Sequence, residues 1–293
     1  MKIVLFGAGG QLGRTFMDVA QFHKINVSAY ARSEADITNE NTVLAILQEE
    51  KPDYVVNAAA YTAVDKAETE HELAFQINEA AVKNIALACK KYNTTLIHLS
   101  TDYVFDGEKN SAYVEDDTSN PINVYGLSKW KGEEVVRQTL EQYIILRVSW
   151  VFGLYGNNFV KTMLKLGRER EAFNIVSDQV GCPTSTENIS EIILEIINHL
   201  ETKESNPFGT YHYCDSPVTN WHAFANKIFS EAKKYQPLKI KQVNAIKAVD
   251  YPTPAKRPMN SQMDCELIKN TFNVEQRSWE QSLNKLVKDL IEQ

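Results

Sequence analysis

A short apolar run, ended by regularly spaced glycines, opens the chain and limits the folds that it can adopt. The run ends at Phe6, and Gly7, Gly10 and Gly13 follow at intervals of three residues. A helical pattern then starts, and its inward-facing positions are Leu12, Phe16, Val19 and Ala20. Glycine is needed where a backbone turns sharply or approaches a pyrophosphate closely, and a helix N-terminus offers free N–H groups to phosphates. The segment predicts a buried strand, a tight turn and a helix that together bind a dinucleotide.

Strand-like and helical patterns alternate through the first half of the chain. Strands are expected at residues 2–6, 25–30, 53–57, 94–100 and 143–149. Helices are expected at residues 11–23, 40–50, 71–92 and 128–141. Regular alternation predicts a parallel sheet that is covered by helices on both faces. With the glycine turn after the first strand, we predict an α/β fold built on a doubly wound, Rossmann-type parallel sheet.

The alternation loosens after about residue 150, where prolines and turn residues become denser. A strong helix is expected to begin near residue 184, because Thr184 and Glu187 have the spacing of a capping box. We predict a dinucleotide-binding domain at residues 1–150, to which the chain returns near residues 175–200. Residues 151–293 are predicted to form mainly a smaller, α+β substrate-binding domain.

Charge and cysteine usage exclude several classes of protein. The net charge of -7 argues against nucleic acid as a partner. No apolar stretch approaches membrane-spanning length, and the N-terminus does not resemble a signal peptide. The cysteines have neither metal-ligand nor disulfide spacing; they are Cys89, Cys182, Cys214 and Cys265. We therefore expect a cytoplasmic protein with reduced thiols, without a membrane or nucleic-acid partner.

A tyrosine and a lysine, Tyr125 and Lys129, stand four residues apart on one face of an expected helix. Free tyrosine has a pKa of about 10, and a fixed positive charge nearby lowers it towards the range of an efficient proton donor. Thr101, Asp102 and Tyr103 follow an expected strand, at the sheet edge where ligands bind. We predict that Thr101 hydrogen-bonds a substrate oxygen beside Tyr125. The alternative is that Ser100 and Thr101 only cap the following turn.

These motifs together resemble the extended short-chain dehydrogenase/reductase family. The shared features are the glycine turn, the alanine-rich strand end at residues 58–60, Thr101, and Tyr125 with Lys129. Longer motifs resemble the dTDP-4-dehydrorhamnose reductases within that family, and they cover residues 56–68, 100–107, 147–153, 178–184 and 257–261. The resemblance spans nearly the whole chain. It implies that a nicotinamide cofactor reduces the 4-keto group of dTDP-4-dehydro-β-L-rhamnose to give dTDP-L-rhamnose.

The resemblance also implies roles for individual residues. Tyr125 is expected to protonate the ketone oxygen, Lys129 to keep that phenol acidic and hold the nicotinamide ribose, and Thr101 to polarise the carbonyl. Substrate contacts are expected from Thr101, Asp102, Tyr103 and Trp150. Besides Tyr125 and Lys129, cofactor contacts are expected from the glycine turn, the second strand end and the alanine-rich segment, namely Gly7, Gly10, Gln11, Leu12, Gly13, Arg32, Asp36, Ile37, Ala59, Ala60 and Tyr61.

The cofactor and metal requirements follow from two further positions. No carboxylate ends the second strand, where it would bind the adenosine ribose, and Arg32 could meet a 2′-phosphate. We expect NADPH, with NADH also usable. Some related reductases form magnesium-bridged dimers through an acid in the first helix, where this chain has Arg14 and Thr15. No metal site is predicted, Mg²⁺ use stays open, and a monomer or homodimer is expected.

Two alternative functions stay open on these residues. Nucleotide-sugar epimerases and other nucleotide-sugar reductases share the tyrosine–lysine pair. A regulatory subunit that resembles the β subunit of methionine adenosyltransferase would keep the cofactor pocket without needing catalysis. The intact set of Thr101, Tyr125 and Lys129 favours an enzyme.

Overall fold

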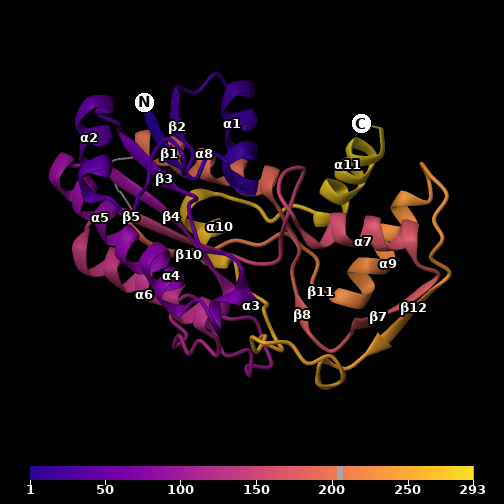
Figure 1. Ribbon diagram of the computed structural model, residues 1–293. Coiled ribbons are helices and arrows are strands. Elements are labelled where there is room, and N and C mark those ends of the chain that lie inside the picture. Colours follow the sequence, from indigo (N-terminus) through magenta and orange to yellow (C-terminus); the bar gives the residue numbers. More distant parts are fainter. Residues whose placement is uncertain (203–206, 293) are drawn as a thin grey trace.

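A six-stranded parallel sheet forms the centre of the larger part of the molecule (Figure 1). The computed structural model describes residues 1–202 and 207–292; residues 203–206 and 293 of the predicted second domain lie outside the described residues. The strands lie in the order β2-β1-β3-β4-β5-β10, and all neighbours are parallel. They are β1 (Ile3–Phe6), β2 (Val27–Tyr30), β3 (Tyr54–Asn57), β4 (Thr95–Thr101), β5 (Tyr143–Val148) and β10 (Gly209–His212). The predicted doubly wound sheet is confirmed.

Helices cover both faces of this sheet, because its strands are apolar on both sides. In β1, Ile3 and Leu5 pack into one core and Val4 and Phe6 into the other, as the two-residue repeat of a strand requires. The first core is closed by α1 (Gln11–Phe22), α8 (Thr186–Thr202) and α10 (Glu266–Phe272). The second is closed by α2 (Glu40–Glu50), α5 (Ala81–Tyr92) and α6 (Val124–Thr139). The chain therefore returns to the larger part after residue 185 through α8, β10 and α10 (Figure 1).

Two of the predicted helices differ in detail from the observed ones. The predicted helix at 71–92 is continuous but contains a wider turn: α4 (His71–Phe75) passes through the π-helical turn η1 (Gln76–Ala80) into α5. Helix α6 begins at Val124, four residues before the predicted start. The reason is a cap, since Asn123 Oδ1 accepts the Gly126 N–H at 2.7 Å.

The predicted capping box at the start of α8 is wrong. Ser185 caps this helix, since its Oγ accepts the Asn188 N–H at 3.0 Å. Thr184 lies in the short strand β9 (Thr184–Ser185) and donates its hydroxyl to the Cys182 carbonyl at 3.1 Å. Glu187 forms an ion pair with Lys285 instead of turning back to the cap. Thr184, which the sequence pattern assigned to the start of the helix, therefore belongs to strand β9.

The smaller part of the molecule has its own apolar core. Helices α7 (Phe159–Glu169), α9 (Trp221–Ala232) and α11 (Trp279–Glu292) pack together beside the parallel pair β7 (Ala172–Val176) and β12 (Gln242–Ile246). Short pairs join the two parts, namely β6 (Val151–Phe152) with β9, and β8 (Val180–Gly181) with β11 (Thr219–Asn220). The division into a cofactor domain and a substrate domain stays a prediction. Within residues 1–202 and 207–292, no helix combines the length and apolar character needed to cross a membrane.

Candidate active site

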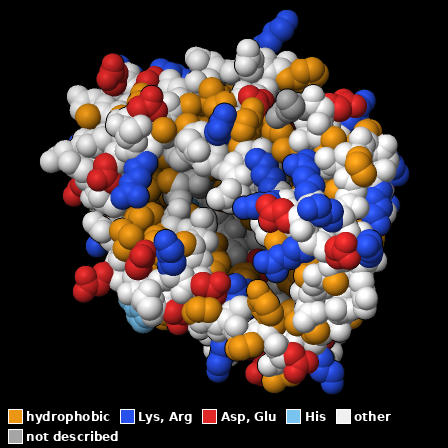
Figure 2. Space-filling model, turned by 45° about the vertical axis from the view of Figure 1, so that its right-hand side comes forward, with side chains coloured by type: hydrophobic (Ala, Val, Ile, Leu, Met, Phe, Trp, Pro, Cys, Tyr) orange, Lys and Arg blue, Asp and Glu red, His pale blue; other side chains and the backbone are white. Residues whose placement is uncertain are grey.

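The predicted site residues lie at the carboxyl ends of the strands of the main sheet, in the order of those strands. The carboxyl ends of β2, β1, β3, β4 and β5 lead into Arg32, the glycine turn, residues 58–61, Thr101 and Trp150 respectively. Ligands of doubly wound sheets bind at this edge. Figure 2 shows a deep hollow in the face of the molecule, with Lys and Arg side chains gathered along one rim. A positive rim favours an anionic ligand.

Two close backbone contacts explain the glycines of the turn. Gly7 has a φ of +88°, and a Cβ atom there would lie 2.5 Å from the Ala59 nitrogen. A Cβ atom on Gly13 would lie 2.2 Å from the Gly7 carbonyl oxygen. Only glycine fits either position without moving the backbone. The turn after β1 and the alanine-rich segment after β3 are therefore packed directly against each other.

The N-terminus of α1 is suited to the phosphates of a dinucleotide. No side chain caps this helix at Gly10, and its first turn contains no acidic residue. Four other helices, α2, α6, α7 and α9, are each capped by an asparagine side chain. Free N–H groups and an unopposed helix dipole bind anions. Of the predicted contacts here, Leu12 packs against the first core, while Gln11 Oε1 accepts the Asn158 amide at 2.7 Å.

We expect Gly13→Ala to weaken both the fold and cofactor binding, because α1 would have to move away from β1. Overpacking of this kind typically costs about 1–3 kcal/mol of unfolding free energy. Thermal unfolding and NADPH titration measure the two effects. Gly9→Ala is the matched control, since a Cβ atom there would meet only the Ala31 side chain, at 3.5 Å. Equal NADPH affinity in the two variants would contradict the proposed close approach.

The end of β2 carries an arginine and, unexpectedly, a carboxylate. Arg32 is exposed, as expected for a residue that meets a cofactor. Glu34 folds back, so that its Oε2 accepts the Ala31 N–H at 2.7 Å. Asp36 accepts the backbone and hydroxyl of Thr38, which lower its pKa. This approach of Glu34 was not predicted, because an acid was expected only at the strand end itself.

The segment after β3 is held by a buried amide that the sequence analysis also missed. Asn78, in the π-helical turn, accepts the Tyr61 N–H at 2.8 Å and donates to the Tyr61 carbonyl at 3.0 Å. Its amide also donates to Ser128 Oγ at 2.9 Å, within α6. Asn57 Oδ1 accepts the Ala59 N–H at 3.1 Å. Asn78 therefore links the alanine-rich segment to the helix that carries Tyr125 and Lys129.

The structure brings Thr101, Tyr125 and Lys129 together. Tyr125 is 9% exposed and Lys129 is 2% exposed, both at the start of α6. Burial raises the pKa of Tyr125 to about 12, although a hydrogen bond with Thr101 lowers it. The predicted acidification of this phenol is therefore wrong for this structure, because burial outweighs the effect of Thr101 and the nearby Asp102 raises the pKa further. At neutral pH the phenol keeps its proton and can donate it.

Lys129 is buried, with a single hydrogen-bond acceptor among the residues that the structure describes. Its Nζ atom donates to the carbonyl oxygen of Leu99 at 2.7 Å. Burial lowers the pKa of Lys129 to about 8, and Glu133 opposes this effect. An ammonium has three donors, so two stay free for a ligand. Lys129 can therefore hold a polar group of a cofactor from inside the site.

Asp102 and Tyr103 surround Tyr125. Burial raises the pKa of Asp102 to about 6, against hydrogen bonds from Ser261 and Thr101. Its Oδ2 atom is buried without a hydrogen-bond partner among the described residues. The Tyr103 ring meets the Tyr125 ring edge-on, with centroids 5.5 Å apart. Thr101 also accepts the Tyr103 N–H at 3.2 Å, so it caps this turn as well as touching Tyr125.

Trp150 is held in a strained conformation beyond the end of β5. Its φ of 46° is rare for a residue with a side chain, and such strain is concentrated at functional sites. Its ring stacks on Trp221, with centroids 3.5 Å apart. Gly181 leaves room for the ring, because a Cβ atom there would lie 2.6 Å from it. Trp150 comes two residues after Val148, which pairs with Thr101, so its backbone continues from the strand end beside Thr101.

The two positions considered for a bridging metal have other contacts. Arg14 lies over the ring of Tyr155, 4.0 Å from its centre. Thr15 forms a 2.9 Å hydrogen bond with Thr186. Among residues 1–202 and 207–292, no group of three or more His, Cys, Asp or Glu side chains is placed to hold a metal ion.

Comparisons with known proteins agree on one family. Residues 1–292 match the family model described as the RmlD substrate binding domain. The dTDP-4-dehydrorhamnose reductase of Aggregatibacter actinomycetemcomitans is 41% identical over 287 residues, which cover 97% of this chain and 98% of that protein. The reductase of the same name from Escherichia coli is 36% identical over 295 residues, covering 99% of this chain and 98% of that protein.

Solved structures give the same result. A dTDP-4-dehydrorhamnose reductase from Bacillus anthracis, in complex with NADP, matches with a TM-score of 0.90 and 36% identity. The match covers 98% of this chain and 99% of that chain. A structure of this reductase from Clostridium acetobutylicum matches with a TM-score of 0.92 and 36% identity over the whole of both chains.

Proposed function

This chain belongs to the RmlD family of dTDP-4-dehydrorhamnose reductases, which are NAD(P)-dependent oxidoreductases, and we propose from that premise how its residues act. The reaction is the NADPH-dependent reduction of the 4-keto group of dTDP-4-dehydro-β-L-rhamnose, which gives dTDP-L-rhamnose. The observation that carries the proposal is that Thr101, Tyr125 and Lys129 lie together near the carboxyl end of β4, two strands from β1 and its glycine turn.

Tyr125, Thr101 and Lys129 have separate roles in the reduction. NADPH, when bound, supplies the hydride for the ketone carbon. Tyr125 gives its proton to the ketone oxygen, where negative charge develops. Thr101 donates a second hydrogen bond to that oxygen, and Asp102, Tyr103 and Trp150 hold the sugar. Lys129 holds the nicotinamide ribose with the two donors that Leu99 leaves free.

The cofactor preference is supported by the exposed Arg32 and by a relative of 36% identity with NADP in its structure. The glycine turn and the uncapped N-terminus of α1 bind the pyrophosphate in this proposal. Asp36 and Ile37 lie beside the adenine, and residues 59–61 line the nicotinamide side. We also propose a cytoplasmic protein, a monomer or homodimer, whose four cysteines stay reduced; all four are buried free thiols.

Arg32→Ala should weaken NADPH binding by about tenfold or more and leave NADH binding nearly unchanged. A hydrogen bond to a charged group contributes about 1.5–3 kcal/mol, and only NADPH carries the 2′-phosphate. Fluorescence titration with each cofactor gives the ratio of dissociation constants. Lys24→Ala removes a surface charge outside the sequence-predicted site and serves as the control. An unaltered ratio in Arg32→Ala would remove this arginine from cofactor selection.

The function itself is tested by product identification. The purified protein is supplied with NADPH and with dTDP-4-dehydro-β-L-rhamnose made by upstream enzymes, and NMR identifies the sugar. We expect dTDP-L-rhamnose, with one NADPH consumed per sugar. A changed sugar stereochemistry without NADPH consumption would indicate an epimerase. Retention on a larger synthetase, with no ketone-dependent oxidation of NADPH, would indicate a regulatory subunit.

A further inference from the structure

A fully buried carboxylate, Glu133, lies one helical turn beyond Lys129 on the same face of α6. Its Oε1 atom accepts Ser100 Oγ at 2.5 Å and Arg147 Nε at 3.0 Å. Its Oε2 atom accepts an Arg147 nitrogen at 2.7 Å and an Arg137 nitrogen at 2.6 Å. Burial alone would raise the pKa of Glu133, but the two guanidinium groups lower it to about 2. This side chain is therefore ionised at every pH at which the enzyme works.

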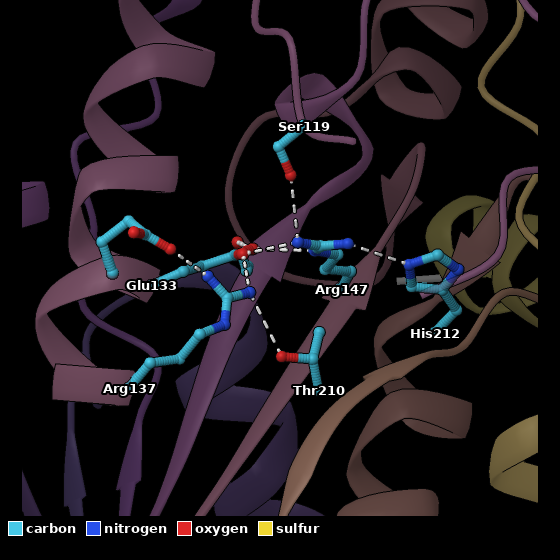
Figure 3. Close-up of polar contacts among 8 residues, drawn as sticks. Ser119, Glu133, Arg137, Arg147, Thr210 and His212 are labelled. Atoms are coloured by element: carbon cyan, nitrogen blue, oxygen red, sulfur yellow. Dashed lines mark hydrogen bonds and ion pairs between the residues drawn. The ribbon is translucent and has the colours of Figure 1, made fainter. Parts of the chain in front are cut away.

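We define the Glu133 cluster as Ser100, Ser119, Glu133, Arg137, Arg147, Thr210 and His212. Figure 3 shows the Arg147 guanidinium between the Glu133 carboxylate and the His212 ring, with Ser119 beside it. Arg137 reaches both Glu133 and Thr210 (Figure 3). Burial and Arg147 lower the pKa of His212 to about 3, so this ring is neutral. The cluster contains two cations and one anion, and Glu133 is that anion.

Three consecutive residues of β4 are joined to three turns of α6. The Leu99 carbonyl accepts the Lys129 ammonium at 2.7 Å, Ser100 donates to Glu133, and Thr101 lies close enough to Tyr125 to lower its pKa. These contacts fix how the strand end with Thr101 sits against the helix with Tyr125 and Lys129. Ser100, the middle one of the three strand residues, contacts Glu133, and Glu133 is the partner with a full negative charge.

We propose that Glu133 is a positioning residue, whose buried negative charge keeps Lys129 protonated and holds the end of β4 against α6. The proposal deepens the proposed reductase function and rests on it. Without Glu133, the Lys129 ammonium would share a buried region with two guanidinium groups and no compensating carboxylate in the cluster. Like charges in a region of low dielectric constant disfavour the charged form, so the lysine would lose its proton at lower pH.

The other charged or titratable groups around Lys129 do not replace Glu133. Burial lowers the pKa of His98 far below its usual value, so that ring is neutral. The Tyr125 phenol is neutral up to about pH 12. Asp102 ionises only above about pH 6 and lies in the turn after β4, with Thr101 and Ser261 as its partners. Arg137, Arg147 and neutral His212 belong to the cluster itself. Two further carboxylates contact it from outside: Glu134 pairs with Arg137, and Glu115 accepts the His212 N–H at 2.9 Å, with a pKa that burial raises.

Glu133→Gln tests the charge directly. We expect the alkaline limb of the kcat profile, which reports loss of the Lys129 proton near pH 8, to move down by roughly one pH unit. A second readout needs neither cofactor nor substrate: ¹³C-lysine NMR of the protein alone, with the Lys129 signal assigned by its loss in Lys129→Met. Glu134→Gln is the matched control, because Glu134 pairs with the same Arg137 but is 37% exposed. It should leave both titrations unchanged.

Arg137→Gln should shift the Lys129 titration in the opposite direction. It also provides a test if Glu133→Gln does not fold. Arg137 is 27% exposed, and its removal leaves Glu133 with one guanidinium partner fewer. We expect the Lys129 titration to move to higher pH. An unchanged Lys129 titration in Arg137→Gln, or in folded Glu133→Gln, overturns the proposal. If the wild type reduces no ketone, the proposed function fails, while the NMR titration still decides the role of Glu133.

Discussion

Tyr125→Phe is expected to lower kcat by about 10²–10⁴-fold, the usual contribution of a positioned general acid. The substitution removes only the hydroxyl group and keeps the ring that packs edge-on against Tyr103. The hydroxyl also loses its interaction with Thr101, which should cost at most about 1 kcal/mol of unfolding free energy. The variant should therefore fold and bind NADPH as the wild type does. Ketone-dependent NADPH oxidation measures the rate, and fluorescence titration measures binding.

Tyr54→Phe is the control for this substitution. Tyr54 is also buried, and its hydroxyl donates to Glu201 at 2.8 Å, but it stands at the first residue of β3, at the opposite edge of the sheet. It should lose a similar amount of stability and keep its turnover. If Tyr125→Phe turned over within threefold of the wild type, another group would have to be the proton donor.

Lys129→Met should lower kcat at least about 10²-fold and weaken NADPH binding by roughly tenfold or more. Methionine retains most of the buried volume of the side chain but supplies no donor, so the ribose loses a charge-assisted hydrogen bond worth about 1.5–3 kcal/mol. The Leu99 carbonyl also loses its partner. Binding and turnover fall together, in contrast to Tyr125→Phe, where only turnover falls. Titration with NADPH and steady-state kinetics separate the two patterns.

Lys131→Met removes the same charge from the same helix and serves as the control. The Lys131 ammonium lies 4.7 Å from the centre of the Trp130 ring. Its loss should leave kcat and the dissociation constant for NADPH close to those of the wild type. Wild-type NADPH affinity in Lys129→Met would show that this lysine does not hold the cofactor.

The sequence predicted five of the six strands of the main sheet, because these strands are largely apolar runs bounded by turn residues. The sixth, β10 at Gly209–His212, was not predicted, because its sequence Gly-Thr-Tyr-His is not an apolar run. The run at 53–57 is β3 at Tyr54–Asn57, and the run at 143–149 is β5 at Tyr143–Val148. The predicted site residues also lie at one edge of that sheet, since each follows directly after a strand. Errors occurred where a side chain outside the pattern caps the start of a helix, as Asn123 and Ser185 do.

Contacts between residues that are distant along the chain could not be predicted from the sequence. Glu133 meets Ser100 and Arg147, 33 and 14 residues away, only because β4 and β5 are neighbours beneath α6. Asn78 likewise meets Ser128 across 50 residues. A motif search finds residues that are close in sequence, and these contacts carry no local spacing that would reveal them.

The local order of residues thus determined the strands, the glycine turn, and the placing of Tyr125 and Lys129 on one helix face. The tertiary structure decided the protonation of those two side chains. Spacing alone predicted a phenol acidified by its neighbour, whereas burial raises the pKa of Tyr125 to about 12 and lowers that of Lys129 to about 8. The spacing of two residues along the sequence is a local property of the chain, but desolvation of a side chain depends on every element that packs around it.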